Sequence, residues 1–144
     1  MHDLIKNSPC ACLHVRRADR LLSQLYDCYL RPAGIRSTQY GLLKHVAELP
    51  EPFISDIGRI LSMDQTTVTR NIEKLGKMGL VTSTPHPDDP RKKMVKLSEA
   101  GQAKIEEARP MWEKAQQHIR SRMSENDYAE LLRLLGKLSR AAQA

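Results

Sequence analysis

The sequence predicts a mainly α-helical chain with a single two-stranded β-hairpin. Two observations support this fold class. Apolar residues recur three and four positions apart in most segments, which is the period of a helix with one buried face. Between Leu80 and Leu97 the period becomes that of strands, and proline and glycine mark the segment ends. At 144 residues, the chain has the length of one domain.

Two helices are expected before residue 50. Leucines and tyrosines at helical spacing predict a helix over residues 12–30, which Pro32 and Gly34 end. Ser37 is expected to cap a second helix, because its hydroxyl can accept a hydrogen bond from a first-turn N–H. That helix stops before Pro50, since the residue preceding a proline disfavours the helical conformation.

Two further helices follow in close succession. The segment ISDIGRILSM, residues 54–63, predicts a helix of about two turns. Its expected inward residues are Ile54, Ile57, Ile60 and Leu61. Asp64 is placed to cap the next helix, DQTTVTRNIEKLGKMGL (64–80), which ends at Gly79. The buried face of that helix is expected to comprise Val68, Ile72 and Leu75.

The last third of the chain contains the hairpin and two more helices. LVTST and MVKL predict short strands on either side of the turn-rich PHPDDPRKK. Ser98 is a plausible cap for a long helix whose axis Pro110 should kink. SEND, residues 124–127, begins a final helix. Its apolar face is too wide for a lone terminal helix in water and comprises Tyr128, Leu131, Leu135, Leu138 and Ala142, flanked by Leu132 and Leu134.

A short helix, a turn, a second helix and a hairpin form the layout of a winged helix-turn-helix. Gly58 is expected where the two helices approach most closely. Burial of the apolar face turns outward Thr66, Thr69, Arg70 and Lys77, with Gln65 and Lys74 at the margins. Threonine is short enough to let a helix enter the major groove, and arginine can bond guanine in bidentate fashion. The alternative is a solvated face with weak ion pairs among Arg70, Glu73 and Lys77.

The hairpin tip supplies a second candidate contact with nucleic acid. PDDPRKK places Arg91 near the tip, with Lys92 and Lys93 behind it. An arginine there can enter a narrow minor groove, where negative potential is concentrated, and Asp89 is placed to hold its guanidinium. The alternative is an ordinary polar hairpin.

Composition and motifs narrow the function classes. The formal net charge is +6, from 23 lysines and arginines against 17 acidic residues, which favours a polyanionic partner. No segment approaches the roughly 18 apolar residues of a membrane span and no secretory signal is visible, so we expect no membrane partner and a cytoplasmic location. Because no phosphate-binding glycine loop, G-x-S-x-G or H-E-x-x-H motif is present, we predict no enzymatic activity and no cofactor.

Three segments resemble successive signatures of the MarR family of bacterial transcription regulators: LRPAGIRSTQY, TVTRNIEKLGKMGLV and DPRKKMVKLSEAG. The resemblance implies a homodimer whose first and last helices interlock and whose two winged lobes read a pseudo-palindrome in double-stranded DNA. It implies one domain over residues 1–144, with a DNA-binding lobe over about 35–100 and dimerisation helices over about 10–32 and 101–144.

Carried over by position, Gln65, Thr66, Thr69 and Arg70 fall on the family's recognition-helix motif, and Asp89 and Arg91 fall on its wing motif. With the outward or marginal Lys77 and Lys74 and the wing residue Lys92, they are the expected DNA-binding residues. Two positions depart from the family pattern. Pro90 stands where a basic or polar residue is common, which stiffens the tip, and Gly58 replaces the more usual alanine.

Many members of this family release DNA when a small phenolic or aromatic acid binds, and others respond to oxidants. With Gln39 and Tyr40 as alignment anchors, Cys12 falls where the organic-peroxide-sensing branch carries its reactive cysteine. A helix N-terminus near basic residues favours a thiolate, and oxidation to a sulfenate or disulfide could alter dimer packing. The alternative for Cys12 is inert packing, and Cys28 is expected to be buried.

A metal site is also considered for Cys10, Cys12 and His14, which spell C-x-C-x-H. On a helix, residues two apart diverge by about 200°, so the three converge only if the segment is extended. No fourth ligand is indicated, and we predict no metal site.

The sequence therefore predicts a dimeric DNA-binding transcription regulator, most often a repressor, that a small aromatic ligand or thiol oxidation releases from DNA. Two alternatives from other classes stay open. One is a helical protein-interaction module with a basic face, and the other is a small thiol redox protein.

Overall fold

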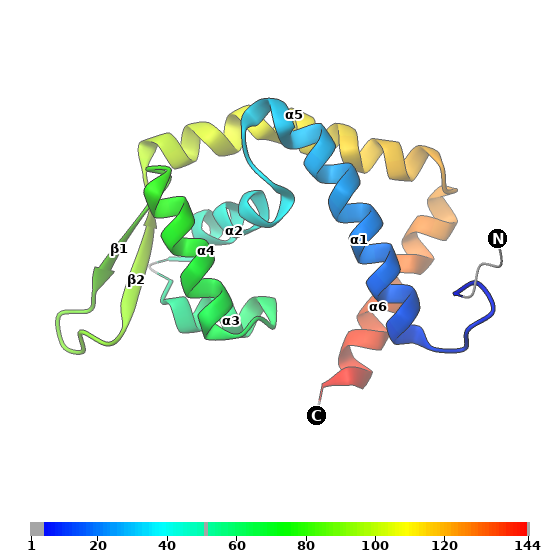
Figure 1. Cartoon of the computed structure of the whole chain (residues 1–144), viewed down its shortest axis with the longest axis horizontal. Coiled ribbons are helices and arrows are strands. Elements are labelled where there is room, and N and C mark those ends of the chain that lie inside the picture. The colour runs from blue at the N-terminus through cyan, green and yellow to red at the C-terminus, as the bar shows by residue number, and fades with distance from the viewer. Residues whose placement is uncertain (1–4, 51, 144) are drawn as a thin grey trace.

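The computed structural model describes residues 5–50 and 52–143. The elements of this part of the chain, in order, are α1 (Ala11–Leu30), a 3₁₀ turn (Arg31–Ala33), α2 (Ser37–Glu48), α3 (Ile54–Leu61), α4 (Gln65–Lys77), β1 (Val81–Pro85), β2 (Lys93–Leu97), α5 (Glu99–Ser121) and α6 (Glu125–Ala142). The predicted fold class and element order are confirmed. Figure 1 shows α2, α3, α4 and the sheet at one end of α5, and α1 and α6 at its other end.

The elements α2, α3, α4, β1 and β2, here called the winged lobe, enclose an apolar core. Its fully buried side chains include Tyr40, Leu43, Ile57, Val68, Leu75 and Val95. A Cβ added at Gly58 would lie 3.0 Å from the carbonyl oxygen of Met63 and 3.6 Å from Cγ2 of Val68. The prediction that α3 and α4 approach most closely at Gly58 agrees with these distances.

The wing is a two-stranded antiparallel sheet in which Val81 pairs with Leu97. Both strands begin and end within one residue of the prediction. An isolated bridge joins Phe53 to Met94, so the segment before α3 pairs with the wing. The sequence gave no sign of this bridge, which fixes the wing against α3.

Helix α5 connects the winged lobe to α1 and α6. Ser98 caps it as predicted, accepting a hydrogen bond from the Gly101 N–H at 3.0 Å and donating one to the Gly79 carbonyl at 2.6 Å. A Cβ at Gly101 would overlap the Leu80 carbonyl oxygen, so this close approach requires glycine. The helix continues through Pro110, and Figure 1 shows it arching over the rest of the molecule.

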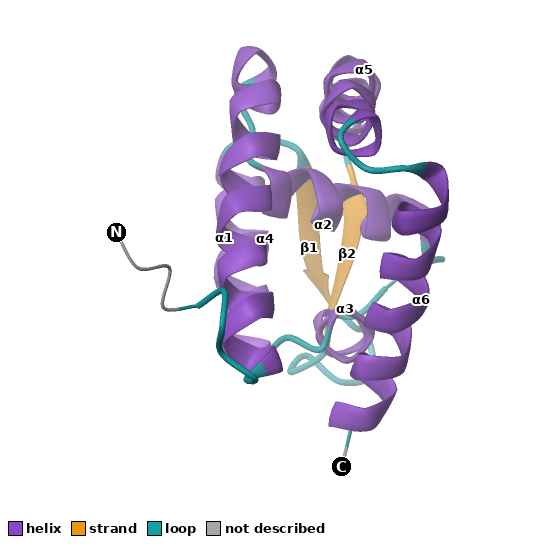
Figure 2. Ribbon diagram, turned by 90° about the vertical axis from the view of Figure 1, so that its right-hand side faces the viewer, coloured by secondary structure: helices purple, strands orange, loops and turns teal. Residues whose placement is uncertain are grey.

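Helices α1 and α6 leave most of their apolar side chains uncovered. α1 packs on α5, and Figure 2 shows α1 and α6 apart from each other on opposite sides of the view. Among its described residues, α6 has none that is buried. The exposed apolar residues of the two helices are Leu13, Val15, Leu21, Leu22, Leu132, Leu134, Leu135 and Leu138. Within residues 5–50 and 52–143, no helix is long and apolar enough to cross a membrane.

Two local sequence predictions are wrong. Ile60 was expected inside, but it is 44% exposed, because α3 turns it away from the stripe that Ile57 and Gly58 press onto α4. Ser37 was expected to cap α2, but it is the first helical residue.

The start of α2 is held by two other side chains. Gln39 Oε1 accepts a hydrogen bond from the Arg36 N–H at 2.9 Å, and Asp27 Oδ1 accepts one from the Ser37 N–H at 2.7 Å. Because Asp27 belongs to α1, this cap also ties the end of α1 to the winged lobe.

Candidate nucleic-acid interface

The outer face of α4 is the centre of the candidate site. Val68, Ile72 and Leu75 are buried beneath it, as their spacing predicts. The predicted outward residues Gln65, Thr66, Arg70, Lys74 and Lys77 are exposed, and Thr69 is half-buried. The helix therefore presents hydroxyl, amide and cationic groups on one side, with Glu73 as an acidic neighbour.

The N-terminus of α4 is fixed by Asp64. Its carboxylate accepts hydrogen bonds from the backbone N–H and the hydroxyl of Thr67, both at 2.8 Å. These bonds lower the pKa of Asp64, with the backbone bond as the largest cause. Because Thr67 is committed to this cap, Thr66 and Thr69 are the threonines of this helix left for a partner.

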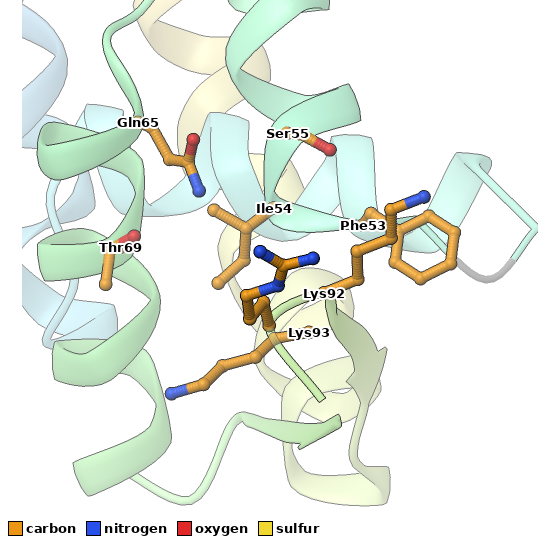
Figure 3. A pocket seen from close by; sticks show the side chains of 8 residues that line it. Phe53, Ile54, Ser55, Gln65, Thr69, Lys92 and Lys93 are labelled. Carbon is orange, nitrogen blue, oxygen red and sulfur yellow. The ribbon is translucent and has the colours of Figure 1, made fainter. Parts of the chain in front are cut away.

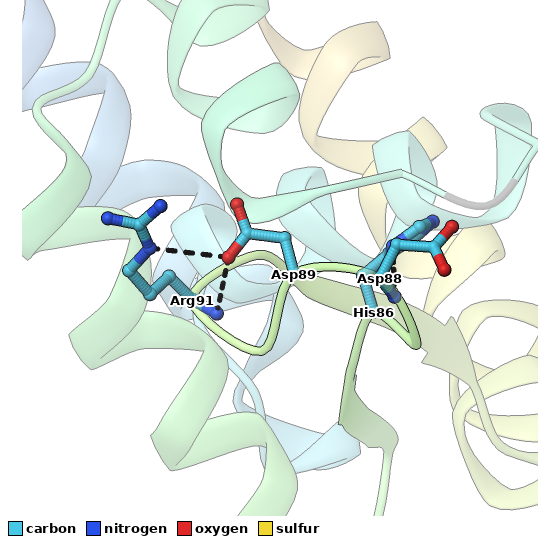
Figure 4. A network of polar contacts seen from close by, with 4 residues as sticks. All are labelled: His86, Asp88, Asp89 and Arg91. Carbon is cyan, nitrogen blue, oxygen red and sulfur yellow. Dashed lines mark hydrogen bonds and ion pairs between the residues drawn. The ribbon is translucent and has the colours of Figure 1, made fainter.

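The wing tip is a closed turn stabilised by Asp89 (Figure 4). The Asp89 carboxylate accepts hydrogen bonds from the Arg91 backbone N–H at 3.1 Å and from Arg91 Nε at 3.3 Å. The Arg91 side chain is nevertheless 91% exposed. His86 Nδ1 accepts a bond from the Asp88 N–H at 3.1 Å, and the Lys92 N–H donates to the Asp89 carbonyl at 3.0 Å. Asp89 thus holds the guanidinium as the sequence predicted, with Pro90 inside the turn.

A cleft of about 290 Å³ separates α4 from the wing. Its lining residues are Phe53, Ile54, Ser55, Gln65, Thr69, Arg91, Lys92 and Lys93. In Figure 3, Gln65 and Thr69 lie on the α4 side, with Ile54 between them and the wing lysines. The sequence prediction did not assign Phe53, Ile54, Ser55 or Lys93 to the site. The triple-basic run RKK was the available signal for Lys93, whereas the α3 residues join the cleft through tertiary packing.

The cysteine predictions have mixed outcomes. Cys10, Cys12 and Cys28 are free thiols on exposed residues. The expectation that Cys28 is buried is therefore wrong, because this position of α1 is not covered by the rest of the chain. Cys12 lies in the first turn of α1, where its exposure is at odds with packing inside the chain.

Of the three C-x-C-x-H residues, Cys10 alone has extended backbone, as the residue that precedes α1. Cys12 and His14 belong to helix α1, and His14 Nε2 lies 2.8 Å from the Ser8 carbonyl oxygen. Within residues 5–50 and 52–143, no group of three or more histidine, cysteine or acidic side chains is arranged to hold a metal ion.

An aromatic cluster joins α1, α2 and α5. The Trp112 ring lies 6.4 Å from that of Tyr26 and 5.8 Å from that of Tyr40, with Lys44 Nζ 5.3 Å from its centroid. Tyr40 is 1% exposed, and its hydroxyl lies near Arg109 without making a well-formed hydrogen bond among the described residues. Burial raises the pKa of Tyr40, against the opposing charge of Arg109.

Comparison with known proteins places this geometry in context. The model of the MarR family matches residues 35–93. The Mycobacterium tuberculosis transcriptional regulator MosR, solved in complex with DNA, is 30% identical, with a TM-score of 0.80 over 94% of this chain and 99% of that chain.

Two further solved structures share the fold. A probable transcriptional regulator from Pseudomonas aeruginosa is 26% identical, with a TM-score of 0.81 over 90% of this chain and 97% of that chain. The PcaV transcriptional regulator from Streptomyces coelicolor, solved with its natural ligand, is 19% identical, with a TM-score of 0.85 over 99% of both chains. The matched proteins are transcriptional regulators rather than enzymes, in agreement with the sequence prediction.

Proposed function

Since the chain belongs to the MarR family of transcription regulators, we propose that it binds a pseudo-palindromic site in duplex DNA as a homodimer and represses transcription from the cytoplasm. The single observation that carries this proposal is the exposed polar face of α4 beside a cationic wing. MosR, which is 30% identical over nearly its whole length, was solved with DNA bound.

Sequence preference is assigned to Thr66, Thr69 and Arg70, with Gln65 at their flank. These side chains project from one face of α4, and a helix is narrow enough to enter the major groove. Lys74, Lys77 and Lys92 supply phosphate contacts, which give affinity without sequence information. Arg91, held by Asp89, extends from the wing tip toward the minor groove.

The homodimer rests on the uncovered leucines of α1 and α6. Leu21 is 55% exposed and Leu132 is 54% exposed, and neither helix covers the other within one chain. Large apolar side chains exposed in this number on two helices indicate an interface. We therefore assign residues of about 35–100 to the DNA-binding lobe, and residues of about 10–32 and 101–144 to the dimerisation helices, of a single domain.

We assign control by a small phenolic or aromatic acid to the cluster around Trp112. The buried Tyr40 hydroxyl makes no well-formed hydrogen bond to the described residues, and Lys44 and Arg109 supply positive charge beside the rings. Thiol oxidation at the exposed Cys12 is the second mode of release. Binding measurements with peroxide-treated protein and with small aromatic acids distinguish the two modes.

Arg70→Ala tests the reading role of α4. We expect a loss of about 1 to 3 kcal/mol on the preferred site, found by selection from a random duplex library, and little change on random DNA. Lys114→Ala is the control, because it removes one positive charge from an exposed position on α5. Equal losses on both DNA sequences for Arg70→Ala would contradict base reading by Arg70.

Arg91→Ala tests the wing. Because a tip arginine favours the narrow minor groove of A·T-rich DNA, we expect the variant to lose affinity most for sites with A·T-rich flanks. The measurement is a comparison of flanking preferences selected by the wild type and the variant. Identical flanking preferences would rule out a minor-groove role.

The alternatives are distinguished by the type of binding. Affinity for a random duplex that falls steeply with salt, together with selection of a two-fold motif, supports the regulator over a protein-interaction module. A single stoichiometric oxidation supports a sensor, whereas repeated turnover of peroxide with a thiol reductant would support a thiol redox protein.

A further inference from the structure

The wing tip contains a histidine whose protonation state is specified by the backbone. His86 follows β1 directly, and its backbone N–H donates to the Lys92 carbonyl at 2.7 Å, which closes the loop. Its ring Nδ1 accepts a hydrogen bond from the Asp88 N–H at 3.1 Å (Figure 4). Because a backbone N–H can only donate, Nδ1 must carry a lone pair. The turn therefore uses the neutral ring, with its proton on Nε2.

We propose that His86 is a positioning residue of the wing, whose neutral ring holds the turn that presents Arg91 to the minor groove and whose protonation releases that turn. The preference for A·T-rich flanks is consequently a function of pH. This inference rests on the proposed function, since His86 acts through Arg91, and it adds a form of regulation to the wing.

The contacts that lead from His86 to Arg91 form a short series. Asp88, whose N–H the ring holds, immediately precedes Asp89. The Asp89 carboxylate accepts hydrogen bonds from the Arg91 backbone N–H at 3.1 Å and from Arg91 Nε at 3.3 Å. Because the Arg91 side chain is 91% exposed, its direction depends on this turn.

Phe53 fixes the orientation of the His86 ring from outside the wing. The centroids of the two rings lie 5.6 Å apart, and a bridge joins Phe53 to Met94 of β2. His86 is half-buried in this position. The bond to Asp88 thus connects the turn to the segment before α3, and not only to the rest of the loop.

A proton on Nδ1 would reverse the contact with Asp88. Two N–H groups would then face each other, so the hydrogen bond is lost, while the new positive charge attracts the Asp88 carboxylate. Both effects turn Asp88 away from its present orientation. Histidine ordinarily changes charge between about pH 5 and 8, so the turn is held at pH 7.5 and released as the pH falls toward 5.5.

Charged groups from two elements surround the ring. Those of the wing have both signs and comprise Asp88, Asp89, Arg91, Lys92 and Lys93. On the α3 side, Asp56 accepts a hydrogen bond from the Phe53 N–H at 3.1 Å and pairs with Arg59 at 3.5 Å. Since α3 contributes an acid and a base that pair with each other, the response to protonation is confined to the wing.

The test measures one ratio at pH 7.5 and at pH 5.5. It is the affinity for the selected site with A·T-rich flanks divided by the affinity for the same site with G·C-rich flanks. For the wild type, we expect the ratio to fall by about threefold or more at the lower pH, as for loss of one hydrogen bond. For Arg91→Ala, the ratio should be low and independent of pH. A ratio cancels changes in general affinity that added positive charge causes.

Two variants separate the ring nitrogen from the ring. His86→Asn keeps an oxygen that can accept from the N–H two residues ahead and does not titrate, so it should keep the high ratio at both pH values. His86→Phe keeps an aromatic ring beside Phe53 but has no acceptor, so its ratio should be low at both. His14→Asn, at an exposed position on α1, is the control and should behave as the wild type. Circular dichroism and thermal unfolding establish that each variant is folded.

The outcomes separate this inference from the function beneath it. If wild-type protein selects no duplex, both are overturned. If it selects a two-fold site but the ratio is the same at both pH values, the regulator stands and the role of His86 is wrong. A ratio in His86→Asn that still falls with pH would assign the titration to another group. A ratio in His86→Asn as low as that of His86→Phe at pH 7.5 would show that the ring nitrogen does not hold the turn, and either result overturns the inference.

Discussion

The winged lobe buries its apolar side chains within one chain, whereas the pair of helices α1 and α6 leaves many of its apolar side chains exposed. In the lobe, Leu43, Ile57 and Val68 are 0% exposed, and their partners come from the same chain. On α6, Leu132 and Leu135 remain 54% and 39% exposed. The lobe is therefore complete within one chain, whereas the helix pair needs a second surface to bury its leucines.

This difference separates two properties of the protein. The shape of α4, the wing and the cleft depends on contacts inside the lobe, so one copy carries the whole of the proposed DNA-contacting surface. In the proposed homodimer, α1 and α6 set the spacing and orientation of two such surfaces, because a two-fold interface sets the relation between half-sites. Substitutions in the two regions should accordingly have different signatures.

The largest effect is expected from Leu135→Asp, which places a carboxylate in the proposed dimer interface. Because a two-fold interface contains the substitution twice, we expect a loss of dimerisation free energy of at least about 5 kcal/mol. Sedimentation velocity at micromolar concentrations should then show a monomer. DNA binding should weaken and lose its two-fold character, while circular dichroism still shows a helical protein.

Asn126→Asp is the matched control for this experiment. It adds the same charge to an exposed position on the opposite side of α6, nine residues and about 180° from Leu135. It should leave the dimer intact. A dimeric Leu135→Asp protein would show that the leucines of α6 do not form the interface.

A pair of leucine truncations sharpens the comparison between the two regions. Leu43→Ala removes a fully buried side chain of the lobe and should lower the free energy of unfolding by about 2 to 5 kcal/mol at every protein concentration. Leu132→Ala removes a side chain that one chain leaves exposed, so the cost should appear as a stronger dependence of the melting temperature on concentration. Similar, concentration-independent losses for both variants would contradict the division between a closed lobe and an open helix pair.

The predictions made from the sequence are most accurate where a single periodic pattern of residues determines the local structure. Asp64 caps α4, and Val68, Ile72 and Leu75 are buried, because the cap residue and the helical period act within a few residues of each other. The exposed side of α4 follows from the same period. The wide apolar face of α6 was also predictable, since its lack of cover inside the chain is a property of its composition.

The failures arise where distant segments decide the outcome. Asp27 of α1 takes part in the start of α2, which a search for a local cap at Ser37 cannot find. Ile60 is exposed because α3 uses only a narrow stripe against α4. The fit of Gly101 against the Leu80 carbonyl and the pairing of Phe53 with the wing depend on packing between elements. For the same reason, the α3 side of the cleft was not predicted.

The smallest expected effect is a pH dependence of stability that arises from one hydrogen-bonded carboxyl group in each region. Hydrogen bonds from Thr67 hold the pKa of Asp64 in the lobe below its ordinary value of 3.8, and a bond from Arg133 lowers the pKa of Glu130 on α6. A carboxyl whose pKa is lower in the folded state contributes stability above its unfolded pKa and loses it as pH falls through the folded value. Both contributions should therefore be present at pH 6 and decline below about pH 4.

Asp64→Asn keeps an oxygen that can accept from the Thr67 N–H but cannot titrate in this range. The difference in unfolding free energy between wild type and Asp64→Asn, measured with urea, should shrink as the pH is lowered from 6 to 2.5. Glu130→Gln should show the same trend. In the Leu135→Asp background, the pH-dependent difference in unfolding free energy should still accompany unfolding of the lobe for Asp64→Asn, because Asp64 lies in the lobe. For Glu130→Gln, whose site lies on α6, it should not. A difference for Asp64→Asn that stays constant with pH would mean that the charge of this cap does not stabilise the start of α4.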